Sequence, residues 1–233
     1  MMRWLFVLTA ALAVLTTPAG AEEYWIAYEG NDFPENEGWT RVYGDGGWPP
    51  EDEPDRWIEN GELVIDTSRD SQLWEYYWLP LFDPGPGETF VAEWRVRSEI
   101  LSGQYDNSVV FARDASPGHV AFRLGTGVLF VATENLSLPI TPAESHVYRF
   151  ESADMQAYTL CIDGEPVHEG HFETDTFLQS YTGFSADAQG TRSVSYWDYY
   201  RFGVVPEPNP LASVIACGLL FGCSVNKERR SIP

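Results

Sequence analysis

The chain has little cysteine. Only 3 of its 233 residues are cysteines, and two of these, Cys217 and Cys223, lie in an apolar segment near the C-terminus. Cys161 is therefore the one thiol of the central region, which excludes an internal disulfide there. The central domain has to be stabilised by its core rather than by cross-links.

Positive charge is also scarce. Lysine and arginine together number 14 against 35 aspartates and glutamates, which gives a formal net charge of −21. Proteins that bind nucleic acids neutralise phosphates with a basic face, so this composition excludes DNA and RNA as partners. The negative charge suits an exported domain in a salty environment, where self-repulsion is screened.

The chain lacks an apolar run of the roughly 20 residues that a membrane-spanning helix needs. Near the N-terminus, Arg3 precedes a shorter apolar run from Trp4 to Leu15, and small residues follow at positions 19–21. This is the pattern of a secretory signal, so residues 1–21 are predicted to be a cleaved signal peptide. An uncleaved anchor helix is the alternative.

A second apolar run covers residues 211–225 and is flanked by a Pro-Glu-Pro triplet and by basic residues. The flanking residues are Pro206, Glu207 and Pro208 before the run, and Lys227, Arg229 and Arg230 after it. This run is predicted to form a short membrane helix of about 22 Å, less than the roughly 30 Å hydrocarbon core, so it would thin the bilayer or be cut off. Basic residues beside a membrane helix stay in the cytoplasm, so the body of the protein is expected outside the inner membrane.

This end of the chain, residues 205–233, resembles the PEP-CTERM sorting signal of Gram-negative envelope proteins. The resemblance implies an exosortase, a membrane transpeptidase, as a partner that removes the tail as the protein reaches the surface. Glu228 interrupts the basic cluster, which departs from the pattern, and a plain tail anchor is the alternative. We expect an exported protein that is transiently anchored in the inner membrane and ends at the cell surface or outside the cell.

The central region, residues 22–204, alternates short apolar runs with clusters of Gly, Pro, Asn and Asp. This spacing is typical of an all-β sandwich. The clearest strand is predicted over residues 88–100, where Phe90, Ala92, Trp94 and Val96 alternate with charged residues. Further strands are predicted at 62–67, 73–79, 108–113, 119–124, 128–133, 146–152, 156–162 and 193–202. Hairpin turns are predicted at 125–127 and 163–164.

Several short motifs of this region resemble the concanavalin A-like lectin/glucanase superfamily in its laminin-G-like form. The motifs are Gly38–Thr40, Asn60–Ile65, Tyr148–Phe150, Tyr158–Gly164 and Tyr196–Phe202. The resemblance implies an antiparallel jelly-roll β-sandwich over residues 22–204.

The glucanases of that superfamily carry Glu-x-Asp-x-x-Glu on one strand, because retaining hydrolysis needs two carboxyl groups roughly 5 Å apart. The nearest match here is residues 173–178, in which Glu173 and Asp175 fit the pattern but Leu178 stands in place of the second glutamate. The domain is therefore expected to be non-catalytic.

Carboxylates that could bind calcium gather in the long loop at 44–56. Calcium prefers several oxygen ligands, and Asp45, Asp52 and Asp55 supply them; Glu29 and Asp198 form a second candidate group. The resemblance also implies calcium, since the superfamily often binds a structural ion. In a chain this acidic, an ordinary charged surface is the alternative.

Aromatic residues are the candidates for ligand binding. Trp48 lies in the acidic loop, and alternation along the predicted strand at 73–79 puts Trp74, Tyr76 and Trp78 on one face and Tyr77 on the other. Sugar rings stack on exposed aromatic faces, so Trp48, Trp78 and Tyr77 are the candidate ligand-binding residues, with core packing as the alternative.

We therefore expect an exported, surface-sorted, non-catalytic sandwich that binds an extracellular polysaccharide or contributes to the extracellular matrix. One alternative is a divergent glycoside hydrolase or polysaccharide lyase. Another is a purely structural envelope protein.

Overall fold

The computed structural model describes residues 24–44, 52–70, 72–103, 105–114, 118–174, 179–187 and 191–206. For residues 24, 25, 105, 106 and 187 only the backbone is described. Predictions on other residues lie outside this description. They concern the signal peptide at 1–21, the apolar helix at 211–225, Asp45, Trp48, Glu207, Pro208, Arg229 and Arg230.

The regular secondary structure of the described chain is almost entirely β-strand. Its strands are β1 (Tyr24–Tyr28), β2 (Thr40–Gly44), β3 (Asp55–Glu59), β4 (Glu62–Asp66), β5 (Trp74–Pro80), β6 (Glu88–Ser102), β7 (Tyr105–Ala112), β8 (His119–Gly125), β9 (Val128–Val131), β10 (Leu136–Pro139), β11 (His146–Ser152), β12 (Ala157–Ile162), β13 (Glu165–His171), β14 (Tyr181–Asp187) and β15 (Arg192–Pro206). Two short 3-10 helices, η1 (Pro34–Glu37) and η2 (Ala132–Glu134), interrupt them. Neither these nor any other described segment forms a helix that is long and apolar enough to cross a membrane.

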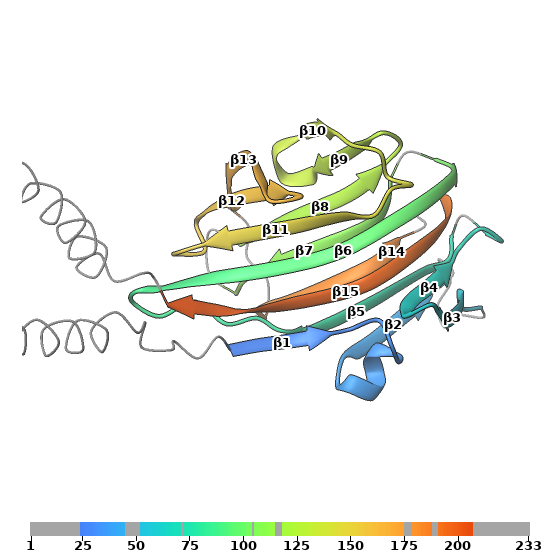
Figure 1. The fold of residues 1–233 in the computed structure, drawn as a ribbon, viewed down its shortest axis with the longest axis horizontal. Coiled ribbons are helices and arrows are strands. Elements are labelled where there is room, and N and C mark those ends of the chain that lie inside the picture. The colour runs from blue at the N-terminus through green and yellow to red at the C-terminus, as the bar shows by residue number, and fades with distance from the viewer. Residues whose placement is uncertain are drawn as a thin grey trace, which may run out of the picture. The chain divides into compact units, whose positions relative to one another are not determined.

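The strands form two antiparallel sheets that pack face to face (Figure 1). The eight-stranded sheet has the order β13-β12-β11-β6-β15-β4-β3, and β1 pairs with the second half of β15. The seven-stranded sheet has the order β10-β9-β8-β7-β14-β5-β2. The central neighbours are distant in sequence, such as β6 and β15 in one sheet and β14 and β5 in the other, as in a jelly roll. The predicted fold class, an antiparallel β-sandwich, is confirmed.

The core between the sheets is rich in aromatic rings. On β6 the predicted inward residues Phe90, Ala92, Trp94 and Val96 are all buried, and the Trp94 ring stacks on Tyr148 with centroids 5.6 Å apart. Across the two sheets, Phe150 of β11 stacks on Phe111 of β7 with ring centroids 4.4 Å apart. Large rings from both sheets therefore pack together and stabilise the domain without any disulfide.

All nine predicted strands are confirmed, with ends that differ by a few residues. The hairpin at 163–164 is also confirmed: Asp163 and Gly164 both have positive φ, 52° and 84°, as the tight turn between β12 and β13 requires. Six strands were not predicted, namely β1, β2, β3, β10, β13 and β14. Among these, β14 matters most because it lies inside the seven-stranded sheet, between β7 and β5.

An aromatic pocket on the seven-stranded sheet

The outer face of the seven-stranded sheet carries a pocket of about 510 Å³. We call it the aromatic pocket. Residues of β2, β5, β7, β8 and β14 line it, together with a residue just before β14. They are Val42, Trp74, Glu75, Tyr76, Trp78, Ser108, Val110, Arg123, Gln179, Tyr181, Ser185 and Ala186.

Strand β5 supplies the aromatic side of the pocket. Its side chains alternate between half-buried and buried, so Trp74, Tyr76 and Trp78 face outward while Glu75 and Tyr77 face the core. Tyr181 of β14 adds a fourth ring, which meets Tyr76 and Trp78 edge-on at centroid distances of 6.2 Å each. The prediction that Trp74, Tyr76 and Trp78 share one face is confirmed.

Tyr77 is placed differently from the sequence-based expectation that it binds a ligand. Its ring is fully buried and stacks on Phe184 with centroids 5.2 Å apart. Because successive residues of a strand point to opposite faces, Tyr77 cannot share the face of Trp78. Tyr77 is a core residue, whereas Trp78 remains a candidate for ligand contact.

The strand registers align a row of side chains across the floor of the pocket. Val42 is opposite Tyr76, Tyr76 is opposite Ser185, Ser185 is opposite Ser108, and Ser108 is opposite Arg123. The two serine hydroxyls hydrogen-bond to each other at 2.7 Å. Adjacent strands lie about 4.8 Å apart, so Tyr76 and Arg123 are separated by about 14 Å along the row. Small residues thus form the floor between an aromatic end and a cationic end.

Two glycines give the aromatic rings room to lie against the sheet. A Cβ at Gly44 would come within 2.7 Å of the Trp74 ring, and a Cβ at Gly183 would come within 2.8 Å of the Tyr76 hydroxyl. A side chain at either position would push the ring out of its place. The sequence therefore leaves a gap in the sheet surface under each ring.

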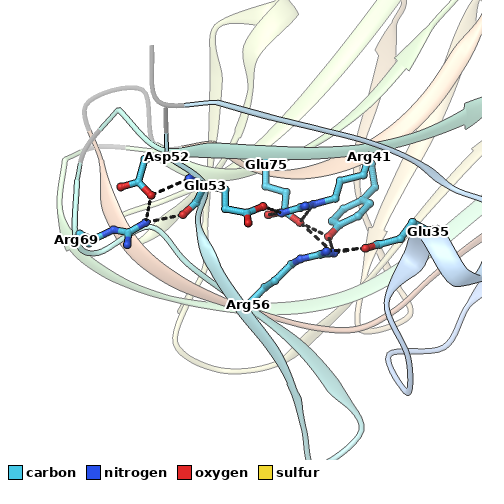
Figure 2. A network of polar contacts seen from close by, with 8 residues as sticks. Glu35, Arg41, Asp52, Glu53, Arg56, Arg69 and Glu75 are labelled. Atoms are coloured by element: carbon cyan, nitrogen blue, oxygen red, sulfur yellow. Dashed lines mark hydrogen bonds and ion pairs between the residues drawn. The ribbon is translucent and has the colours of Figure 1, made fainter. Parts of the chain in front are cut away.

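A network of arginines and carboxylates surrounds Glu75, whose side chain is on the buried side of β5 (Figure 2). The fully buried carboxylate of Glu75 accepts two hydrogen bonds of 2.9 Å from Arg41 of β2, and Arg56 of β3 approaches it to 3.7 Å. Arg56 also pairs with Glu35 at 2.6 Å, and Arg41 pairs with Glu53 at 2.9 Å. These ion pairs connect β5 to β2 in its own sheet and to β3 in the other sheet. They therefore hold in position the strand that carries Trp74, Tyr76 and Trp78.

Protonation in this network is set by burial and charge together. Burial raises the pKa of the Tyr77 hydroxyl well above its ordinary value, and the charge of Glu75 raises it further. Tyr77 therefore stays protonated and donates a hydrogen bond to Glu75. Burial acts to lower the pKa of Arg41, but the hydrogen bonds and charge of Glu75 outweigh it and raise that pKa.

Three of the four described carboxylates of the calcium hypothesis lie within 4 Å of an arginine. Asp52 lies 2.9 Å from Arg69, and Asp55 lies 3.9 Å from the same side chain (Figure 2 shows the first contact). Asp198 pairs with Arg95 at 2.9 Å. Glu29 is exposed just after β1.

Among the described residues, no three His, Cys, Asp or Glu side chains form a group that could hold a metal ion. Asp45 and Trp48 lie outside the described part, so calcium binding by the whole loop stays a prediction. A melting temperature measured in excess calcium and in chelator tests it, because a ligand that binds only the folded state raises stability.

Most of the pocket was not predicted from the sequence. Ser108, Arg123, Tyr181 and Ser185 have no motif around them, and their role depends on the register of β14. A pattern was present: on β14 Tyr181 and Ser185 line the pocket, whereas Thr182 and Phe184, which alternate with them, are fully buried. Glu173, the start of the incomplete glucanase motif, is not in the pocket and lies 3.5 Å from His119.

Comparison with known proteins identifies similar folds but no close relative in sequence. No protein-family model matches the chain, and no curated protein sequence matches it. Many solved structures do match, and the neighbours are concanavalin A-like lectin/glucanase jelly rolls.

Three of these structures, two enzymes and a lectin, show the kinds of protein that share the fold. An endo-1,3-β-glucanase from Streptomyces sioyaensis has a TM-score of 0.56 at 13% identity, over 83% of this chain and 99% of the glucanase. A GlcNAcα1-4Gal-releasing endo-β-galactosidase from Clostridium perfringens has 0.55 at 15% identity, over 81% of this chain and 64% of the galactosidase. Lectin I-B4 from Griffonia simplicifolia has 0.50 at 11% identity, over 78% of this chain and 99% of the lectin. This chain thus spans less than two thirds of the galactosidase, and identities this low establish a shared fold only.

Proposed function

We propose that the domain binds a glycan in the aromatic pocket and does not cleave it. The observation that carries this proposal is the set of Trp74, Tyr76 and Trp78, which stand side by side on the outer face of β5 and line a pocket of about 510 Å³. Pockets of this size, lined by aromatic side chains with a few polar groups, are typical of ligand sites.

The chemistry of the pocket fits a sugar chain. The rings offer flat apolar faces for the C–H surfaces of sugars, and Ser108, Ser185 and Gln179 offer hydrogen-bonding groups for hydroxyls. The row from Tyr76 to Arg123 is about 14 Å long, which favours an oligosaccharide over a single ring. Lectins and glycoside hydrolases among the structural neighbours support a carbohydrate as the ligand class.

Binding without cleavage is supported by the charges of the described pocket residues. Retaining hydrolysis needs two carboxyl groups roughly 5 Å apart. The only described carboxylate in the lining is Glu75, whose side chain is fully buried on the core side and held by Arg41. It cannot reach a glycosidic bond in the pocket.

Hydrolysis is the second candidate function, because two of the neighbours are glycoside hydrolases. The backbone register places Asp187 opposite Trp74, one of the aromatic lining residues. Incubating the chain with laminarin and with galactans and measuring reducing ends tests this candidate. Turnover by the wild type that is lost in an Asp187→Asn variant would replace the binding proposal with an enzymatic one.

We further propose that the protein is exported and sorted to the envelope by its two ends. The support is the signal-like pattern at residues 1–21 and the PEP-CTERM-like pattern at residues 205–233. A tagged full-length chain should then be found outside the cytoplasm of a Gram-negative host. Cytoplasmic retention would contradict this proposal without affecting the binding site.

The binding proposal is tested with Trp78→Ala and a matched control, Trp57→Ala. Trp57 lies on β3 of the other sheet with 38% of its surface exposed and is outside the aromatic pocket. A glycan-array screen identifies a binding oligosaccharide, and calorimetry then gives the affinities. Trp78→Ala should weaken binding by about 1 to 3 kcal/mol, whereas Trp57→Ala should leave it unchanged. Equal affinities of both variants would exclude the pocket, and no binding to any glycan would favour a purely structural role.

A further inference from the structure

The positive charge of Arg123, at the end of the aromatic pocket away from Tyr76, narrows the class of glycan that the pocket would bind. The described part of the chain contains ten arginines, and eight of them make ion pairs with carboxylates. The exceptions are Arg192, which is exposed at the start of β15, and Arg123 in the pocket. In a chain with 35 acidic residues, an arginine without a carboxylate partner among the described residues is unusual.

Arg123 is partly buried, unlike Arg192. Its Nε atom is buried and has no hydrogen-bond partner among the described residues. Buried polar atoms in proteins are nearly always satisfied, and a charged donor gains the most from an ionised acceptor. Ser108, its cross-strand neighbour, is already hydrogen-bonded to Ser185. The guanidinium therefore lacks an anionic partner from the described protein.

We propose that the glycan in the aromatic pocket carries a negative charge, a carboxylate or a sulfate on a sugar ring, and that Arg123 binds this group. The inference rests on the proposed glycan-binding function and names its substrate class. A ligand that covers the pocket strips water from Arg123, and a neutral hydroxyl replaces that hydration only in part. A carboxylate or sulfate offers two oxygens to the planar guanidinium and compensates its charge.

The net charge of −21 opposes this binding only at long range. At physiological ionic strength the screening length is about 8 Å, so exposed carboxylates elsewhere on the molecule contribute little inside the pocket. A contact with a partly buried arginine is screened much less. The local cation therefore outweighs the distant negative charge.

The test uses the full-length chain and pairs of probes, each a charged oligosaccharide and its neutral counterpart. Oligogalacturonate is compared with its methyl ester, and a sulfated galactan oligosaccharide with its desulfated form, by calorimetry. We expect at least one charged probe to bind about tenfold tighter than its neutral partner. Arg123→Gln should remove this preference, Arg123→Lys should keep part of it, and the control Arg192→Gln should keep all of it.

The outcomes separate this inference from the proposed function. Equal binding of charged and neutral probes, or a preference that survives in Arg123→Gln, would overturn the inference while leaving glycan binding intact. If neutral glycans bind in a manner that depends on Trp78 but no charged probe binds, the inference also fails. If no glycan of either kind binds, both proposals fail. Whichever pair shows the preference identifies the anion as carboxylate or sulfate.

Discussion

Neutralising the buried carboxylate of Glu75 is expected to destabilise the domain strongly. Glu75 is fully buried and faces two arginines, whose side chains are only 14% and 18% exposed. Glu75→Gln keeps the shape of the side chain but leaves Arg41 and Arg56 close together without the central negative charge. Breaking a buried ion pair by removing one partner costs about 3 to 5 kcal/mol.

The expected loss lies at the lower end of that range. Arg41 retains Glu53 as a partner and Arg56 retains Glu35, at 2.9 Å and 2.6 Å. We therefore expect a loss of about 3 kcal/mol in the free energy of unfolding, which lowers the melting temperature of a domain of this size by about 6 to 12 °C. Urea titration followed by tryptophan fluorescence and a thermal scan measure both quantities.

The matched control is Asp198→Asn, which breaks an ion pair on the surface. Asp198 and Arg95 are 32% and 44% exposed, so the loss should stay below about 1 kcal/mol. Adding Arg41→Met to Glu75→Gln should recover part of the lost stability, because it removes one uncompensated charge. Equal losses for Glu75→Gln and Asp198→Asn would refute the reasoning that burial makes the difference.

Three further predictions concern the rest of the sandwich. Stability should fall as the pH drops below about 4.5. Burial acts to raise the pKa of Glu93, but hydrogen bonds from Arg201 and Tyr199 outweigh it and lower that pKa below the ordinary 4.5. The unfolded chain therefore takes up a proton at this glutamate before the folded chain does. Melting temperatures measured between about pH 3 and 7 should show this fall, and Glu93→Gln should make the melting temperature depend less on pH. The same pH dependence in Glu93→Gln as in the wild type would contradict the role given to Glu93. Gly183→Ala should cost about 1 to 3 kcal/mol in urea unfolding, since its Cβ would lie 2.2 Å from the Tyr77 carbonyl oxygen, and an unaffected midpoint would show that the sheet adjusts. Trp94→Ala should cost about 3 to 5 kcal/mol because the ring is buried between the sheets, and a loss below about 1 kcal/mol would contradict that placement.

The fold could be predicted from the sequence where the period-2 pattern is strong. Strand β6 alternates large apolar and charged residues, and its buried and exposed faces agree with that pattern. Strand β13 could not be found in this way, because it lies at a sheet edge and nearly all its side chains face solvent. Strand β14 could not be recognised for a different reason. It contains Gly183, and Thr182 and Ser185 are buried although they are polar, so the apolar-polar alternation is lost.

The candidate site was predictable only in part. Alternation alone places Trp74, Tyr76 and Trp78 on one face and Tyr77 on the other, but it does not say which face is buried. For this reason the sequence could not show that Tyr77 is a core residue rather than a ligand contact. Arg123 joins the site through pairings between strands far apart in sequence, and no local pattern carries that information. Strand register, set by the whole sandwich, determines the chemistry of the pocket.

The central claim, that a glycan binds on the outer face of β5, is tested most directly by a crystal structure of the chain with a bound oligosaccharide from the array screen. We expect sugar rings stacked on the face of Trp74, Tyr76 and Trp78, with the oligosaccharide extending over Ser185 and Ser108 toward Arg123. An oligosaccharide bound elsewhere, with the aromatic pocket empty, would contradict it.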